Sequence, residues 1–185
     1  SVYSTQKTLP SNEYSDVSPE NKYAMAKYAS ELLLNSMVKQ KQTNIRLASL
    51  IGVNTDIRVV NKFVEFALLN GEINIVGGLQ KFLYMDVRDA ASALIALMET
   101  KNWKPVYNLG TTRQHTIVEI AEIIKDVAKT KLNKDVLINL EEKDINLDVG
   151  MDSTLFYQDT AWRPKYSLED TIKSIFDFKL KGMQK

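Results

Sequence analysis

The fold class follows from the stretch Ile45-Arg46-Leu47-Ala48-Ser49-Leu50-Ile51-Gly52, in which a short apolar run ends at a glycine. A run of this length between polar segments predicts a buried strand. The next apolar segment, 59–70, has the spacing of a helix and stops at Gly71, because glycine is the residue that most often follows the end of a helix. A buried strand followed directly by a helix is typical of a parallel sheet covered by helices.

The same alternation continues on both sides of this stretch. Ser18-Pro19 predicts the start of a helix that runs to about Gln40, with Ser18 as the N-cap and proline in the first turn. Asp89 is predicted to cap a helix that runs to about Glu99. Capping boxes predict two later helices, at Thr116 with Glu119 and at Ser167 with Asp170. Strands are expected at 73–76, 82–87, 106–110 and 136–140, so the chain is predicted to be an α/β protein.

Composition excludes several classes of site. The chain has 185 residues with a net charge of +1, so no field favours nucleic acid or an anionic membrane. It has no cysteine and one histidine, His115, which excludes disulfides and cysteine or multi-histidine metal sites, and no metal is expected. No apolar run approaches the roughly 18 residues of a membrane-spanning helix. We expect a cytoplasmic protein in which His115 is a solvated turn residue.

Tyr23 and Lys27 are the candidate catalytic residues. The spacing i and i+4 places both side chains on one face of the first predicted helix, one turn apart. A tyrosine that acts as a base near neutral pH needs a pKa well below its usual value near 10. A nearby ammonium group favours the phenolate and so supplies part of that change.

Further motifs surround this pair in a definite order. The chain starts at Ser1 without methionine, and Ser1-Val2-Tyr3-Ser4 reads as the end of a strand. The segments are Val2-Tyr3, Pro10, Glu13, Pro19, Tyr23-Ala24-Met25-Ala26-Lys27, Glu31, Arg46-Leu47-Ala48-Ser49-Leu50-Ile51-Gly52, Asn70-Gly71-Glu72, Ile75-Val76-Gly77-Gly78, Phe82 to Ala91, Val106-Tyr107-Asn108-Leu109-Gly110, Asp152-Ser153 and Trp162-Arg163-Pro164 followed by Ser167-Leu168-Glu169. This ordered set resembles the NAD-dependent sugar-nucleotide epimerases and dehydratases, which are extended short-chain dehydrogenases/reductases.

The resemblance implies a fold and a division into parts. The chain is expected to hold the C-terminal part of a Rossmann-type parallel sheet plus a small α/β substrate-binding domain. Residues 1–53 and 84–109 would be the remnant of the NAD-binding domain, and 54–83 with 110–185 the substrate-binding domain. The family's phosphate-cradling G-x-x-G-x-x-G motif cannot be formed by the seven glycines present. We therefore expect the N-terminal cofactor-binding half to be absent and the fragment by itself to be inactive.

The resemblance also implies a reaction and the residues that perform it. Tyr23 would take a proton from a sugar hydroxyl as hydride leaves the same carbon for NAD, and Lys27 would hold the nicotinamide ribose. The transient ketone would then allow epimerisation or dehydration of a nucleoside-diphosphate sugar. Ser49, Lys62 and Lys81 are the candidate substrate-binding residues, although the family has asparagine in place of Ser49. A homodimer is expected, through residues 32–37.

Two alternatives remain open. The first is an NAD(P)-dependent reductase of a keto sugar or small carbonyl compound, which would use similar residues. The second is a cofactor-binding regulatory protein that kept the fold and lost turnover. Retention of both Tyr23 and Lys27 argues against the second, because a protein that only binds does not need a tuned base. Ala26, where the family has serine, argues mildly for it.

Overall fold

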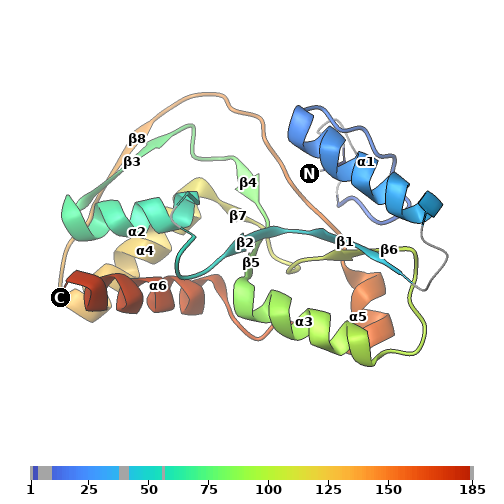
Figure 1. Ribbon diagram of the computed structural model, residues 1–185. Coiled ribbons are helices and arrows are strands. Elements are labelled where there is room, and N and C mark those ends of the chain that lie inside the picture. The colour runs from blue at the N-terminus through green and yellow to red at the C-terminus, as the bar shows by residue number, and fades with distance from the viewer. Residues whose placement is uncertain (1, 4–9, 38–41, 56, 184–185) are drawn as a thin grey trace.

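The α/β architecture is seen in a computed structural model, which describes residues 2–3, 10–37, 42–55 and 57–183 (Figure 1). Helices and strands alternate along most of this length. In chain order the elements are α1 (Lys22–Met37), β1 (Asn44–Leu47), β2 (Ser49–Ile51), α2 (Val59–Leu69), β3 (Glu72–Val76), β4 (Lys81–Phe82), β5 (Tyr84–Asp86), α3 (Val87–Glu99), β6 (Val106–Leu109), β7 (His115–Thr116), α4 (Ile117–Leu132), β8 (Leu137–Glu141), α5 (Thr154–Thr160) and α6 (Leu168–Met183).

The strands pair mainly in parallel, as the sequence predicts. β1 pairs with β6, β2 with β5 and β3 with β8, all in parallel, whereas the short strands β4 and β7 pair antiparallel. Each parallel pair joins segments that are at least one helix apart in the sequence, because a parallel connection must cross back over the sheet. The predicted α/β class with parallel strands is therefore confirmed.

Two apolar cores hold these elements together. The larger core lies between α2, α4 and α6 and includes fully buried Ile73, Ile120 and Phe176. The smaller core lies between α3, α5 and β6 and is built around Tyr107 and Phe156, whose rings meet edge to face at 5.6 Å. Figure 1 shows the two groups of helices at opposite ends of the strands, with α1 lying apart from both. The division into domains at 53/54, 83/84 and 109/110 stays a prediction.

Both predicted capping boxes are present. The Thr116 side chain accepts from the Glu119 backbone N–H at 3.1 Å, and the Glu119 carboxylate accepts from the Thr116 N–H at 2.7 Å. Ser167 and Asp170 exchange the same two kinds of bond, at 3.1 and 3.0 Å. These motifs could be identified from the sequence because all of their partners lie within one turn.

Two predicted helix starts are wrong. The first helix begins at Lys22 rather than at Ser18-Pro19, because the Asn21 side chain accepts from the Ala24 N–H at 2.9 Å and takes the capping role. The predicted end of that helix near Gln40 lies outside the described residues. Asp86, not Asp89, caps α3, since its Oδ1 accepts from the Arg88 N–H at 2.8 Å.

Asp89 and His115 also differ from expectation. Asp89 is fully buried and accepts from the backbone N–H groups of Lys165 and Tyr166, both at 3.0 Å, so it ties α3 to the segment that leads into α6. His115 is buried in β7 rather than solvated, and burial, followed by the charge of Arg113, lowers its pKa below the usual value. None of the described helices is long and apolar enough to cross a bilayer.

Candidate functional site

Tyr23 and Lys27 lie one turn apart on the same face of α1. The Lys27 Nζ is 5.6 Å from the centroid of the Tyr23 ring, and both side chains are exposed, the tyrosine to 68%. The predicted juxtaposition of a phenol and an ammonium group is therefore present. Their exposure leaves them free to contact a cofactor and a substrate, and their catalytic role stays a prediction.

Polar bonds attach the helix of this pair to the neighbouring strand. The Asn44 side chain in β1 donates to the Asn35 side chain in α1 at 2.9 Å, and Arg46 donates to Glu31. The Tyr3 hydroxyl accepts from Arg46 at 2.8 Å and donates to Asn108 of β6 at 2.6 Å. These bonds connect α1 to the strand pair β1–β6, and β1 leads directly to Ser49 at the start of β2.

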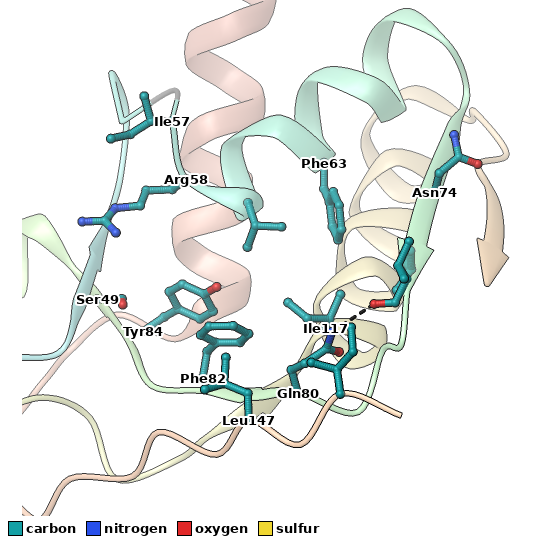
Figure 2. Close-up of a pocket in the computed structure, with 14 residues that line it drawn as sticks. Ser49, Ile57, Arg58, Phe63, Asn74, Gln80, Phe82, Tyr84, Ile117 and Leu147 are labelled. Carbon is teal, nitrogen blue, oxygen red and sulfur yellow. Dashed lines mark hydrogen bonds between the residues drawn. The ribbon is translucent and has the colours of Figure 1, made fainter. Parts of the chain in front are cut away.

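A pocket of about 430 Å³ has Ser49 in its lining (Figure 2). It is bordered by β2, the start of α2, β3, the strands β4 and β5, and the chain around residues 145–147. The lining residues are Ser49, Ile57, Arg58, Val59, Phe63, Asn74, Ile75, Val76, Gln80, Phe82, Tyr84, Ile117, Ile145 and Leu147. The pocket is thus mostly apolar and aromatic, with a few polar groups, which is the usual character of a small-molecule site.

Aromatic rings form one side of the pocket. Phe82 and Tyr84 stack with their ring centroids 5.8 Å apart, and Figure 2 shows Phe63 on the facing side, at the start of α2. Burial raises the pKa of the Tyr84 hydroxyl to about 12, although the nearby charge of Arg58 acts in the opposite direction. Tyr84 is therefore neutral at physiological pH and cannot serve there as a base.

Arg58 is a pocket residue that sequence reasoning missed. It occupies the N-cap position of α2 and makes no capping hydrogen bond with its side chain. A cation at a helix N-terminus is unfavourable in itself, because the helix dipole already places partial positive charge there. The two positive groups together would attract an anion. The sequence did contain a signal that could have identified Arg58. An arginine stands directly before a predicted helix, at a position where an acidic or hydroxyl residue is expected.

The three predicted substrate-binding residues lie in different surroundings. Ser49, at the start of β2, lines the pocket. Lys62 is exposed on α2 and Lys81 is exposed on β4, where its ammonium group lies 3.7 Å from the Asp148 carboxylate. Neither lysine belongs to the lining. Their contact with a substrate stays a prediction, as does that of Ser49.

Comparisons with known proteins identify relatives of this chain. UDP-glucuronic acid decarboxylase 1 from Danio rerio is 28% identical over 142 residues, a match that covers 70% of this chain and 34% of that protein. UDP-glucuronic acid decarboxylase 5 from Arabidopsis thaliana is 26% identical, covering 93% of this chain and 53% of that protein. The chain thus spans between a third and about half of these two relatives.

Solved structures show the same fold. The UDP-glucose 4-epimerase of Thermotoga maritima, crystallised with UDP-glucose, superposes with a TM-score of 0.83 at 28% identity over 98% of this chain and 60% of that one. The UDP-glucuronic acid 4-epimerase of Bacillus cereus superposes with the same TM-score, 0.83, at 18% identity, which shows the fold alone.

A family model matches the part of the chain that carries Tyr23, Lys27 and Ser49. The match extends over residues 1–110, more than half of the 185 residues, and its description is the NAD dependent epimerase/dehydratase family. The parallel strand pairs and the motif order agree with that match. This chain belongs to the NAD-dependent epimerase/dehydratase family.

Proposed function

We propose that the full-length protein uses NAD to epimerise or dehydrate a nucleoside-diphosphate sugar through a transient keto intermediate. The observation that carries the proposal is the pair Tyr23 and Lys27, one turn apart on an exposed face of α1 within the region that matches the family. A purely regulatory cofactor-binding protein would not need a phenol and an ammonium group in this arrangement. Reduction of a keto sugar uses the same pair and is the alternative within enzymes.

Tyr23 and Lys27 would act on the sugar and on the ribose of the cofactor. Tyr23 would take the proton from a sugar hydroxyl, and the neighbouring ammonium group favours the phenolate form that this step requires. When bound, NAD supplies the acceptor for hydride. The exposed pair would contact the nicotinamide-ribose end of the cofactor. The glycines at 52, 71, 77, 78, 110, 150 and 182 do not have the spacing of a pyrophosphate cradle, so residues outside these 185 would hold the phosphates.

The pocket beside β2 would hold the nucleoside diphosphate. Its aromatic side, formed by Phe82 and Tyr84, suits a planar base. Arg58 and the N-terminus of α2 suit the diphosphate, because an arginine and free backbone N–H groups both favour negative charge. Ser49 would contact the substrate from β2. UDP is the first nucleotide to test, because the names of the relatives described above specify UDP or UDP-sugars.

The same proposal includes the roles of two lysines, the oligomeric state and the location of the protein. Lys62 and Lys81 would approach the diphosphate from the rim, outside the lining residues. The protein would be a homodimer that uses the apolar side of α1 near residues 32–37. It would work in the cytoplasm.

Decarboxylation is a second candidate reaction, favoured by the decarboxylase relatives, because a ketone β to a carboxylate promotes loss of CO₂.

Ligand-induced stabilisation of the full-length protein tests the binding part of this proposal. Thermal unfolding of the full-length protein is measured in the presence of NAD alone and in the presence of NAD plus one sugar nucleotide. The sugar nucleotides are UDP-glucose, UDP-glucuronic acid, and GDP-, dTDP- and CDP-sugars. A ligand present at about 100 times its Kd should add about 2.7 kcal/mol of stability. Arg58→Leu should reduce the stabilisation by the preferred ligand, whereas Arg113→Leu, at a largely exposed arginine outside the pocket, should not. Absence of stabilisation by every sugar nucleotide would contradict the proposal.

A further inference from the structure

Gln80 is a buried polar residue on the wall of the pocket. Only 8% of the residue is exposed. In the sequence it directly precedes β4, and in space it contacts the end of β3 and the start of α4. Its Nε2 donates to the Val76 carbonyl at 2.9 Å, the bond drawn as a dashed line in Figure 2. Its Oε1 is buried and has no hydrogen-bond partner among the described residues.

The bond to Val76 settles which end of the Gln80 amide is the acceptor. A flipped amide would turn Oε1 toward the Val76 carbonyl, so that two acceptors would face each other, whereas the observed orientation pairs a donor with an acceptor. The backbone fixes the residue from the other side, because the Ile117 N–H donates to the Gln80 carbonyl at 3.2 Å. The unpaired group is therefore an acceptor that needs a donor.

Gly77 makes room for this placement. It adopts a φ of +82°, in the left-handed region that favours glycine, and a Cβ there would lie 2.9 Å from the Gln80 Nε2. A side chain at position 77 would therefore displace the amide. The local backbone holds a glutamine amide against the pocket although one of its polar atoms has no hydrogen-bond partner in the part of the chain that the structure describes.

A buried acceptor without a partner is unfavourable, and a ligand in the pocket can remove that cost. Phe82, which stacks on Tyr84, provides an aromatic surface in the same pocket. We propose that Gln80 is a specificity-determining residue that accepts a hydrogen bond from the N3–H of a uracil base bound in this pocket, an inference that rests on the proposed function. Because Oε1 is buried, a ligand would reach it only after the amide turns toward the pocket, and the broad minimum of the last torsion of a glutamine side chain allows such a turn.

Methylation of the base tests the inference directly. Binding of UDP and of 3-methyluridine diphosphate to the full-length protein with NAD is measured by calorimetry. The wild type should bind UDP at least about tenfold more tightly, because methylation removes the donor and leaves Oε1 unpaired. In Gln80→Leu the ratio should fall below about threefold. Gln114→Leu, the same change at a glutamine outside this pocket, should keep the wild-type ratio.

The outcomes separate this inference from the function on which it rests. Equal affinity of the wild type for UDP and 3-methyluridine diphosphate would overturn the role of Gln80. This comparison uses the wild type alone, so it remains decisive even if Gln80→Leu folds poorly. A variant that keeps the full wild-type ratio would overturn the role as well. Binding of CDP or ADP, whose bases lack the N3–H donor, in preference to UDP would also contradict it. Failure to bind any nucleoside diphosphate would instead overturn the proposed function, and this inference with it.

Discussion

Arg46 of β1 holds Glu31 of α1 through two hydrogen bonds, from Nη2 to Oε1 at 2.7 Å and from Nε to Oε2 at 3.1 Å. Both side chains are nearly buried, with exposed fractions of 10% and 12%. A two-bonded arginine–carboxylate pair fixes the relative orientation of the elements that carry it. This pair therefore sets the position of the helix that carries Tyr23 relative to the strand that leads to Ser49.

Removal of Glu31 should destabilise the protein. Glu31→Ala leaves the cation of Arg46 nearly buried, with the Tyr3 hydroxyl as its remaining side-chain hydrogen-bond partner among the described residues, and we expect a loss of about 2–3 kcal/mol in the free energy of unfolding. Chemical denaturation measures it. The control Glu122→Ala breaks an exposed pair with Lys125 and should change stability by less than about 0.5 kcal/mol. Equal effects of the two variants would show that the Glu31–Arg46 pair is no stronger than a surface pair.

Ala161→Gly should stabilise the protein. Ala161 ends α5 with a φ of +56°, a left-handed conformation in which its Cβ is strained. Glycine relieves that strain at some cost in chain entropy, so we expect a gain of about 1 kcal/mol, measured by denaturation. Asn133→Gly, at the left-handed end of α4, is the control and should gain less, because asparagine tolerates this conformation. A loss of stability in Ala161→Gly would refute the assignment of strain.

Asp86 should make stability depend on acid. Burial by itself would raise the pKa of Asp86, but hydrogen bonds from Arg88 and Thr171 outweigh burial and hold it below the usual value. An unfolded aspartate titrates near pH 3.9, so the stability from this carboxylate is present above that pH and is lost as the pH falls through the lower folded value. Between pH 7 and pH 3 the melting temperature of Asp86→Asn should fall less than that of the wild type. An equal fall would exclude Asp86 as a source of the acid dependence.

The features that the sequence predicted correctly depend on neighbours within one turn, although two helix starts of the same local kind were predicted at the wrong residue. The two capping boxes and the Tyr23–Lys27 juxtaposition are of this kind, because helical spacing alone brings the partners together. Helix α5 was not predicted because it is only seven residues long and Ala161, rather than glycine, ends it. Serine at position 153 is a common residue type at a helix start, but it makes no capping bond here.

The pocket could not be assembled from the sequence, because its residues meet only through tertiary packing. Arg58 precedes α2, whereas Gln80 and Phe82 come from the segment between β3 and β5. Ser49 was identified by motif resemblance, and no spacing rule connects it to the other three. The unpaired acceptor of Gln80 is a property of burial and of the Val76 contact, and neither is encoded in a local pattern.

Tyr23→Phe in the full-length protein tests the proposed base. The change removes one hydroxyl from an exposed ring, so the melting temperature should stay within about 1 °C while turnover falls by at least about a hundredfold. Turnover is measured on the sugar nucleotide that stabilises the wild type most. Tyr14→Phe, at an exposed tyrosine outside α1, should retain full activity. Activity of Tyr23→Phe within a few fold of wild type would exclude Tyr23 as the base.

The 185-residue chain by itself should not bind NAD with useful affinity. In the proposed function Tyr23 and Lys27 would contact only the nicotinamide ribose, and the glycines of these 185 residues do not have the spacing that places backbone N–H groups around the pyrophosphate. Calorimetry with NAD should detect no binding in the micromolar range. Micromolar affinity would show that residues of this chain hold the phosphates after all.

The apolar side of α1 should make the isolated chain self-associate. Leu32, Leu33 and Met37 have exposed fractions of 51%, 57% and 74%, and apolar side chains gathered on one helix in this way favour association. Sedimentation at increasing concentration should therefore show dimers or larger species. Leu33→Lys should shift the distribution toward monomer without lowering the melting temperature, because the side chain it replaces is already solvent-exposed. A wild-type chain that stays monomeric at high concentration, with a cooperative unfolding transition, would show that this surface needs no partner.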